Sequence, residues 1–141
     1  MPNTPPQLVA GGTIRPHRFV KLDGSNDFTG LEADANDIVI GISQVGGNRP
    51  PLDDLVSTNN AAIAGETFRL FGEGDICLIE AGDTFAHGAR LKSDNDGRGV
   101  AITTTGTTIQ HFGARALEAA TAVGQLVRAQ VMIGSERPAL T

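Results

Sequence analysis

The side chains of this chain that could perform chemistry are few and far apart in the sequence. The single cysteine, Cys77, lies in a stretch of alternating residues at 75–80, and this pattern predicts a buried, unreactive thiol. The three histidines, His17, His87 and His111, lack the i, i+4 spacing that places two metal ligands on one side of a helix. We therefore expect them on the surface or in turns, and a three-histidine site assembled by folding is the alternative.

Two short motifs resemble ligand-binding sequences but lack essential residues. Gly72-Glu73-Gly74 begins like a dinucleotide-binding motif, yet Cys77 occupies the third glycine position and no helix is expected to follow. Residues 94–97 resemble part of a calcium loop, but Lys92 and Thr103 stand where that loop needs its first and last acidic ligands. A hairpin turn is the better interpretation of residues 94–97. No catalytic residue, cofactor or metal site is predicted, so we expect a protein that is not an enzyme.

The main alternative is an enzyme or carrier domain whose site forms only on folding. An enzyme would bring His87 or His111 beside Cys77 and a carboxylate. A lipoyl-like or biotinyl-like carrier would need a modified lysine at a hairpin tip, and neither Lys21 nor Lys92 stands in that context.

Composition and charge exclude several classes of partner. The chain has 141 residues with 16 acidic and 11 basic side chains, and its net charge of −5 argues against nucleic acid as a partner. Six Phe with no Trp or Tyr leave few surfaces for stacking bases or sugars. The sequence contains no apolar run of membrane-spanning length and no leader pattern. We therefore expect synthesis in a host cytoplasm and no membrane partner.

Short alternating segments between turn residues predict an all-β fold. With seven to nine strands in one small domain, we expect a sandwich or a partly closed barrel, because a sheet with one apolar face must cover it. One or two helical turns are expected at residues 81–88 and 116–123. In the strand at 38–45, Ile38, Ile40 and Ile42 should share one face. The other expected strands are 18–22, 66–71, 75–80 (paired with 66–71 as a hairpin or meander), 90–92, 99–105, 107–112 and 126–133.

The expected organisation is a single domain with extended additions. Residues 1–12 contain Pro2, Pro5 and Pro6 and are predicted to form an extended arm. Residues 13–135 should form the β-rich domain, interrupted by a long loop at 46–65, and residues 136–141 a tail. The core consists of small aliphatic residues with few aromatics, so we expect moderate stability alone and a contribution from oligomerisation.

The second half of the sequence resembles a family of small tailed-phage proteins, the capsid decoration or cement proteins. The resemblance covers about half of the chain and rests on turn and strand motifs rather than catalytic ones. The matching residues are Gly41–Gln44, Gly65-Glu66, Ile79–Gly82, Gly88–Asp94, Asp96–Gly99, Ala116–Ala120 and 125–131.

The resemblance implies a β-clip or barrel that binds the exterior of an assembled phage head as a homotrimer and stabilises it. The partners would be the major capsid protein and other copies of the chain, and the location would be the outer surface of the virion. A tail or spike component is the alternative. The arm and the long loop depart most from a compact core, so we expect capsid and subunit contacts there. The candidate contact residues are Leu8, Val9, Ile14, Arg15, Arg49, Leu52 and Leu55.

Overall fold

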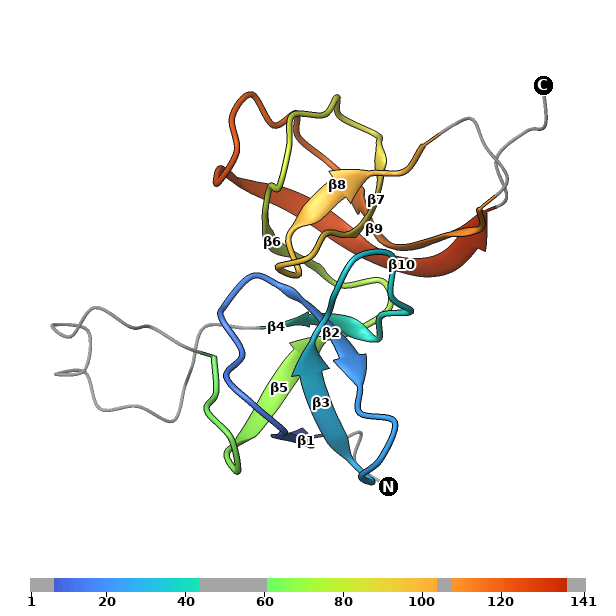
Figure 1. Ribbon diagram of the computed structural model, residues 1–141. Helices are drawn as coiled ribbons and strands as arrows, with labels where there is room; N and C mark the ends of the chain where they lie inside the picture. Colours follow the sequence, from blue (N-terminus) through green and yellow to red (C-terminus); the bar gives the residue numbers. More distant parts are fainter. Residues whose placement is uncertain (1–6, 44–60, 104–107, 137–141) are drawn as a thin grey trace, which may run out of the picture.

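The computed structural model describes residues 7–43, 61–103 and 108–136, and ten strands in these residues form two sheets (Figure 1). The prediction of an all-β fold is confirmed, and the described residues contain no helix. The first sheet is a closed barrel in the order β1 (Gln7–Ala10), β3 (Thr29–Glu32), β2 (Phe19–Leu22), β4 (Gly41–Ser43) and β5 (Thr67–Phe71). The second has the order β6 (Ile76–Glu80), β10 (Leu126–Glu136), β9 (Gln110–Ala116), β7 (Arg90–Ser93) and β8 (Gly99–Ala101).

Strand β1 closes the barrel because it pairs with strands on both sides. Val9 lies opposite Thr29 in a parallel ladder with β3, and Leu8 lies opposite Phe68 in an antiparallel ladder with β5. The interior holds a small apolar cluster of Leu8, Ala10, Ile14, Val20, Ala61, Ala62 and Phe68. Glycine is required at Gly30, since a Cβ there would lie 2.6 Å from Cζ of Phe68.

The expectation of an extended arm over residues 1–12 is wrong for residues 7–10, which form strand β1. Residues 7–10 form a barrel strand: Leu8 and Ala10 are buried, Val9 between them is exposed, and both backbone edges of the strand pair with neighbours. Residues 1–6 lie outside the described part of the chain. The proline content that suggested an arm is concentrated in that part.

The second sheet is built around β10, its longest strand. Val127, Ala129 and Val131 are buried on one face of β10, as their period of two predicts. The register shifts between Val131 and Gly134, so Ile133, expected on the buried face, is exposed. An isolated bridge between Ala81 and Gly99 joins the two edges of this sheet.

Three other expectations are wrong in detail. The helical turns at 81–88 and 116–123 do not form; Phe85 and Ala120 make an isolated antiparallel bridge instead. The segments at 66–71 and 75–80 do not pair, because β5 joins the barrel and β6 joins the second sheet. Strand β4 begins only at Gly41, so Ile38 is exposed while Ile42 is fully buried.

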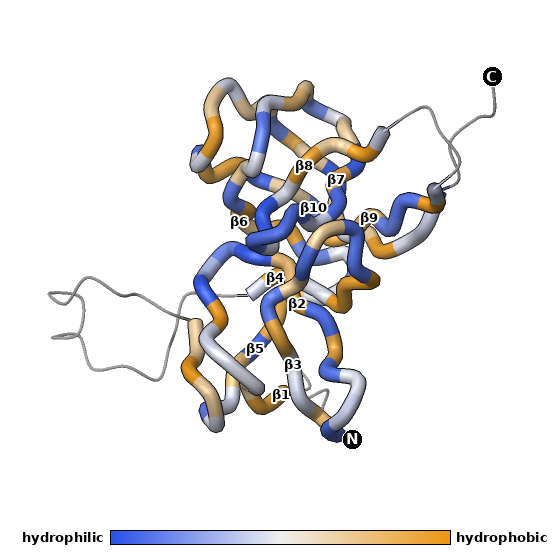
Figure 2. Tube along the Cα trace, in the orientation of Figure 1, coloured by the Kyte–Doolittle hydropathy of each residue, from blue (hydrophilic) through white to orange (hydrophobic). Residues whose placement is uncertain are grey.

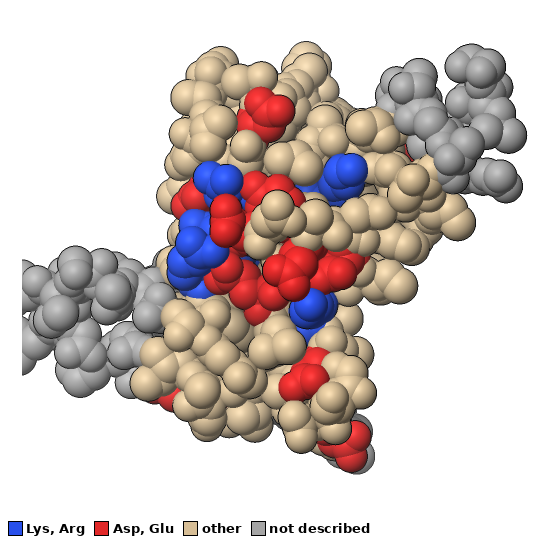
Figure 3. Space-filling model, in the orientation of Figure 1, with Lys and Arg blue, Asp and Glu red and all other residues tan. Residues whose placement is uncertain are grey.

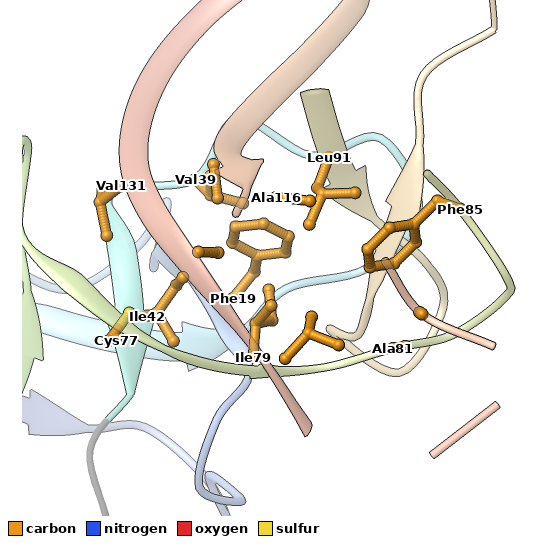
Figure 4. Close-up of a cluster of buried hydrophobic side chains, with 14 of the residues drawn as sticks. Phe19, Val39, Ile42, Cys77, Ile79, Ala81, Phe85, Leu91, Ala116 and Val131 are labelled. Carbon is orange, nitrogen blue, oxygen red and sulfur yellow. The ribbon is translucent and has the colours of Figure 1, made fainter. Parts of the chain in front are cut away.

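The barrel and the second sheet share one hydrophobic core. Phe19, Val39 and Ile42 from the barrel side belong to the same buried cluster as Ile79 and the other inward residues of the second sheet (Figure 4). Apolar and polar residues alternate along the strands that enclose this cluster (Figure 2). The two sheets therefore pack as a unit.

Candidate functional site

The most reactive side chain types of the sequence, cysteine and histidine, lie on different elements of the described structure, with Cys77 on β6 and His111 on β9. Cys77 is buried, as predicted, and burial with a smaller contribution from Asp75 raises the pKa of its thiol to about 12. His111 lies on β9 with its Nδ1 2.7 Å from Oγ of Ser135. Within the described residues, no three His, Cys, Asp or Glu side chains come together as metal ligands. No apolar helix of membrane-spanning length occurs in residues 7–43, 61–103 or 108–136.

Charged side chains gather instead over the junction between the barrel and the second sheet (Figure 3). Arg18 is buried, and its guanidinium donates to Oε2 of Glu80 at 3.0 Å and to the Asp96 carbonyl at 2.8 Å. Arg15 pairs with Glu32 at 2.5 Å and lies 3.7 Å from Oδ1 of Asp96. We call these five residues the junction network. They connect the barrel to β6 and to the β7–β8 turn.

Backbone contacts reinforce the junction at the same place. The Phe19 amide donates to the Gly97 carbonyl at 2.7 Å, and the Glu80 amide donates to the His17 carbonyl at 3.0 Å. His17 has a positive φ of 61°, and its Nδ1 is buried without a hydrogen-bond partner. Burial lowers the pKa of His17, and a hydrogen bond to the Leu78 backbone opposes this shift. The junction therefore favours neutral histidine beside a buried arginine.

The predicted contact residues occupy very different positions. Leu8 and Ile14 are 8% and 0% exposed, because both side chains fill the barrel interior. Contrary to the expectation from the sequence, neither side chain is available for contact with a partner. Val9 is 38% exposed on the outer side of β1, and Arg15 belongs to the junction network. Arg49, Leu52 and Leu55 lie outside the described residues, as does most of the predicted 46–65 loop.

Several exposed apolar side chains were missed by sequence reasoning. Phe28 is the most exposed, at 76%, and it follows the polar turn between β2 and β3. Leu22, at the end of β2, is 55% exposed. An aromatic residue directly after the turn residues 23–27 was a usable signal, because a turn is seldom part of the core. The other large exposed apolar residues are Ile38, Ile63, Ile76, Leu78, Ile109, Leu117, Val123, Leu126 and Ile133.

Comparison with known proteins gives a structural match. No family model matches the sequence, and no curated protein matches it either. Among solved structures, the fold is similar to the crystal structure of the head fiber gp8.5 N base of bacteriophage phi29. The TM-score is 0.61 at 16% sequence identity, and the match covers 89% of this chain and 91% of that one. Over 89% of its length, this chain is therefore similar in fold to the head fiber base of that phage.

Proposed function

We propose that this chain is a structural protein of a phage virion that binds the exterior of the assembled head and stabilises it. The similarity in fold to a phage head fiber base, over nine-tenths of both chains, carries this proposal. The sequence resemblance to capsid decoration proteins supports it independently, because it rests on turn and strand motifs rather than on the arrangement of sheets.

The proposed activity is binding rather than catalysis. A protein that binds the assembled shell but not its separated subunits stabilises the shell by mass action. The partners are the major capsid protein and other copies of this chain in a homotrimer, with no role for nucleic acid or membrane. Trimeric attachment makes the second and third contacts intramolecular, which increases avidity without a stronger individual interface.

The shared core and the junction network suit this role. A subunit that transmits load between a shell and its surroundings needs its two halves fixed to each other. Here a buried apolar cluster and a buried arginine hold the barrel against the second sheet. The chain can therefore bind a partner through the barrel or through the second sheet while the two remain attached to each other.

Deleting the gene from the phage that encodes the chain tests the proposal. We expect particles whose heads lack this protein and release their genome at a lower temperature than complete particles, measured by dye access to DNA during heating. Sedimentation equilibrium of the purified protein should give three times the chain mass. Presence of the protein in tails but not in heads would refute attachment to the head, and would favour a tail or spike component.

A further inference from the structure

The end of the barrel that lies away from the second sheet exposes apolar residues that belong to neither buried cluster. They are Val9 on β1, Leu22 at the end of β2 and Phe28 just before β3, which are 38%, 55% and 76% exposed. Two acidic residues of the same hairpin, Asp23 and Asp27, flank them. We call these five residues the barrel-end patch. On the face that Figure 3 draws, acidic groups stand among uncharged atoms at this end.

The exposure of Phe28 is unusual for this protein. Phe19, Phe68, Phe85 and Phe112 are all at most 9% exposed. Isolated exposed apolar residues are ordinary. Phe28, however, shares its hairpin with the exposed Leu22, and its carbonyl accepts from the amide of the exposed Val9, so three exposed apolar residues lie on adjoining backbone, which indicates an interaction site.

The backbone holds Phe28 in a conformation that its own preferences oppose. Its φ is +52°, a left-handed conformation that is rare for a bulky residue. The Val9 amide donates to the Phe28 carbonyl at 2.8 Å, and Oγ1 of Thr29 donates to the Asp27 carbonyl at 3.0 Å. The aromatic ring is thus presented outward from a fixed hairpin, and such strain is typical of functional positions.

Both charged side chains of the patch are acidic. Oδ1 of Asp23 accepts from the Ser25 amide at 2.9 Å and its Oδ2 accepts from the Asn26 side chain at 3.1 Å. These hydrogen bonds lower the pKa of Asp23. Lys21, the nearest basic residue in sequence, pairs with Asp34 and Asp37 at 3.1 and 3.0 Å.

We propose that the barrel-end patch is the surface that binds the phage head, with Phe28 entering an apolar pocket of the shell that is bordered by lysine or arginine side chains. This inference rests on the proposed function. Charge complementarity identifies the occupant: an acidic rim around an aromatic anchor selects a protein surface with a basic rim. A rigid anchor loses little conformational freedom on binding, which favours affinity.

Substitution by glycine separates binding from folding at this position. Phe28→Gly removes the ring but suits the left-handed backbone better than phenylalanine does. The variant should therefore melt at or above the temperature of the unaltered chain. Ile76→Ala is the matched control, because Ile76 is 61% exposed on β6 in the other sheet.

The experiment measures co-sedimentation with heads purified from a phage that lacks the gene. We expect Phe28→Gly to raise the half-saturating concentration at least ten-fold, and Ile76→Ala to change it less than two-fold. Asp27→Asn should reduce the dependence of binding on salt concentration, since it removes one charge of the rim.

The outcomes distinguish the two proposals. If the unaltered chain binds heads and Phe28→Gly binds equally well, the patch is not the docking surface and the proposed function stands. If Phe28→Gly alters the oligomer mass in sedimentation equilibrium, the patch is a contact between copies and the inference is overturned. If the unaltered chain does not bind heads at all, the proposed function fails and the inference fails with it.

Discussion

Substitution of Gly113 by alanine tests whether the barrel and the second sheet truly share a core. Gly113 lies on β9, and a Cβ at this position would stand 2.7 Å from Cε1 of Phe19 and even closer to Cγ2 of Val39. Both neighbours belong to the barrel side and are at most 2% exposed. The Phe19 ring would have to retreat by about 1 Å to restore ordinary carbon contact.

The expected cost follows from this geometry. Overpacking a buried site costs about 1–3 kcal/mol, and replacing a strand glycine by alanine returns about 0.5–1 kcal/mol. Because the new Cβ would clash with two buried side chains, we expect the upper part of this balance. Gly113→Ala should lower the free energy of unfolding by about 1–2.5 kcal/mol, measured by urea denaturation at one protein concentration. The melting temperature should fall by about 3–5 °C for each kcal/mol.

Two further variants make the test specific. Gly72→Ala is the control, because a Cβ there meets nothing within 4 Å, and its stability should be unchanged or slightly higher. Val39→Ala removes one of the two crowding side chains, so the double variant should lose at least about 0.5 kcal/mol less than the sum of the single losses. Additive losses, or an unaffected Gly113→Ala, would show that β9 does not pack against the barrel.

Three further predictions concern the ion pairs of Arg18, the titration of His17 and the reactivity of Cys77. Arg18→Met should lower the free energy of unfolding by about 1–3 kcal/mol, because it leaves the Glu80 carboxylate and the Asp96 carbonyl without their hydrogen-bond donor. Loss of the exposed ion pair between Arg128 and Glu118 should cost under about 0.5 kcal/mol. Equal losses in urea denaturation would contradict this contrast. Because the folded pKa of His17 is lowered, the unfolded chain binds more protons below about pH 6.5, so stability should fall as pH decreases from 7 to 5 by at most about 1.4 kcal/mol per unit. His17→Asn, which keeps the left-handed backbone accessible, should flatten this part of the profile; an unchanged slope would rule His17 out as its source. Cys77, with a thiol pKa near 12, should resist iodoacetamide at pH 8 until denaturant is added, and rapid labelling of the native protein would show that the thiol is accessible.

The sequence predicts strands better than it predicts their partners. The alternation at Val127, Ala129 and Val131 identifies β10 and its buried face directly, because period two reports burial on one side. It does not report which strands pair. Thus β5 and β6, adjacent in sequence and joined by a turn at Gly72–Gly74, belong to different sheets. Pairing depends on long-range packing around Phe19, which lies far from both in sequence.

Surface function was harder to predict than the fold. Leu8 and Ile14 looked available for contact because prolines precede them, yet the barrel needs both in its interior. Phe28, for which the sequence analysis made no prediction, is exposed because it lies at the end of the turn between β2 and β3 and has a positive φ. Exposure of a single apolar residue is set by the end of an element, and element ends are poorly defined by periodicity.

The central claim is attachment to the outside of a phage head, and imaging tests it most directly. Undecorated heads mixed with the purified chain and examined by cryo-electron microscopy should gain density on the outer surface at three-fold or quasi-three-fold positions, with the barrel end toward the shell. Heads that gain no density at saturating protein, or density confined to the tail, would contradict the account.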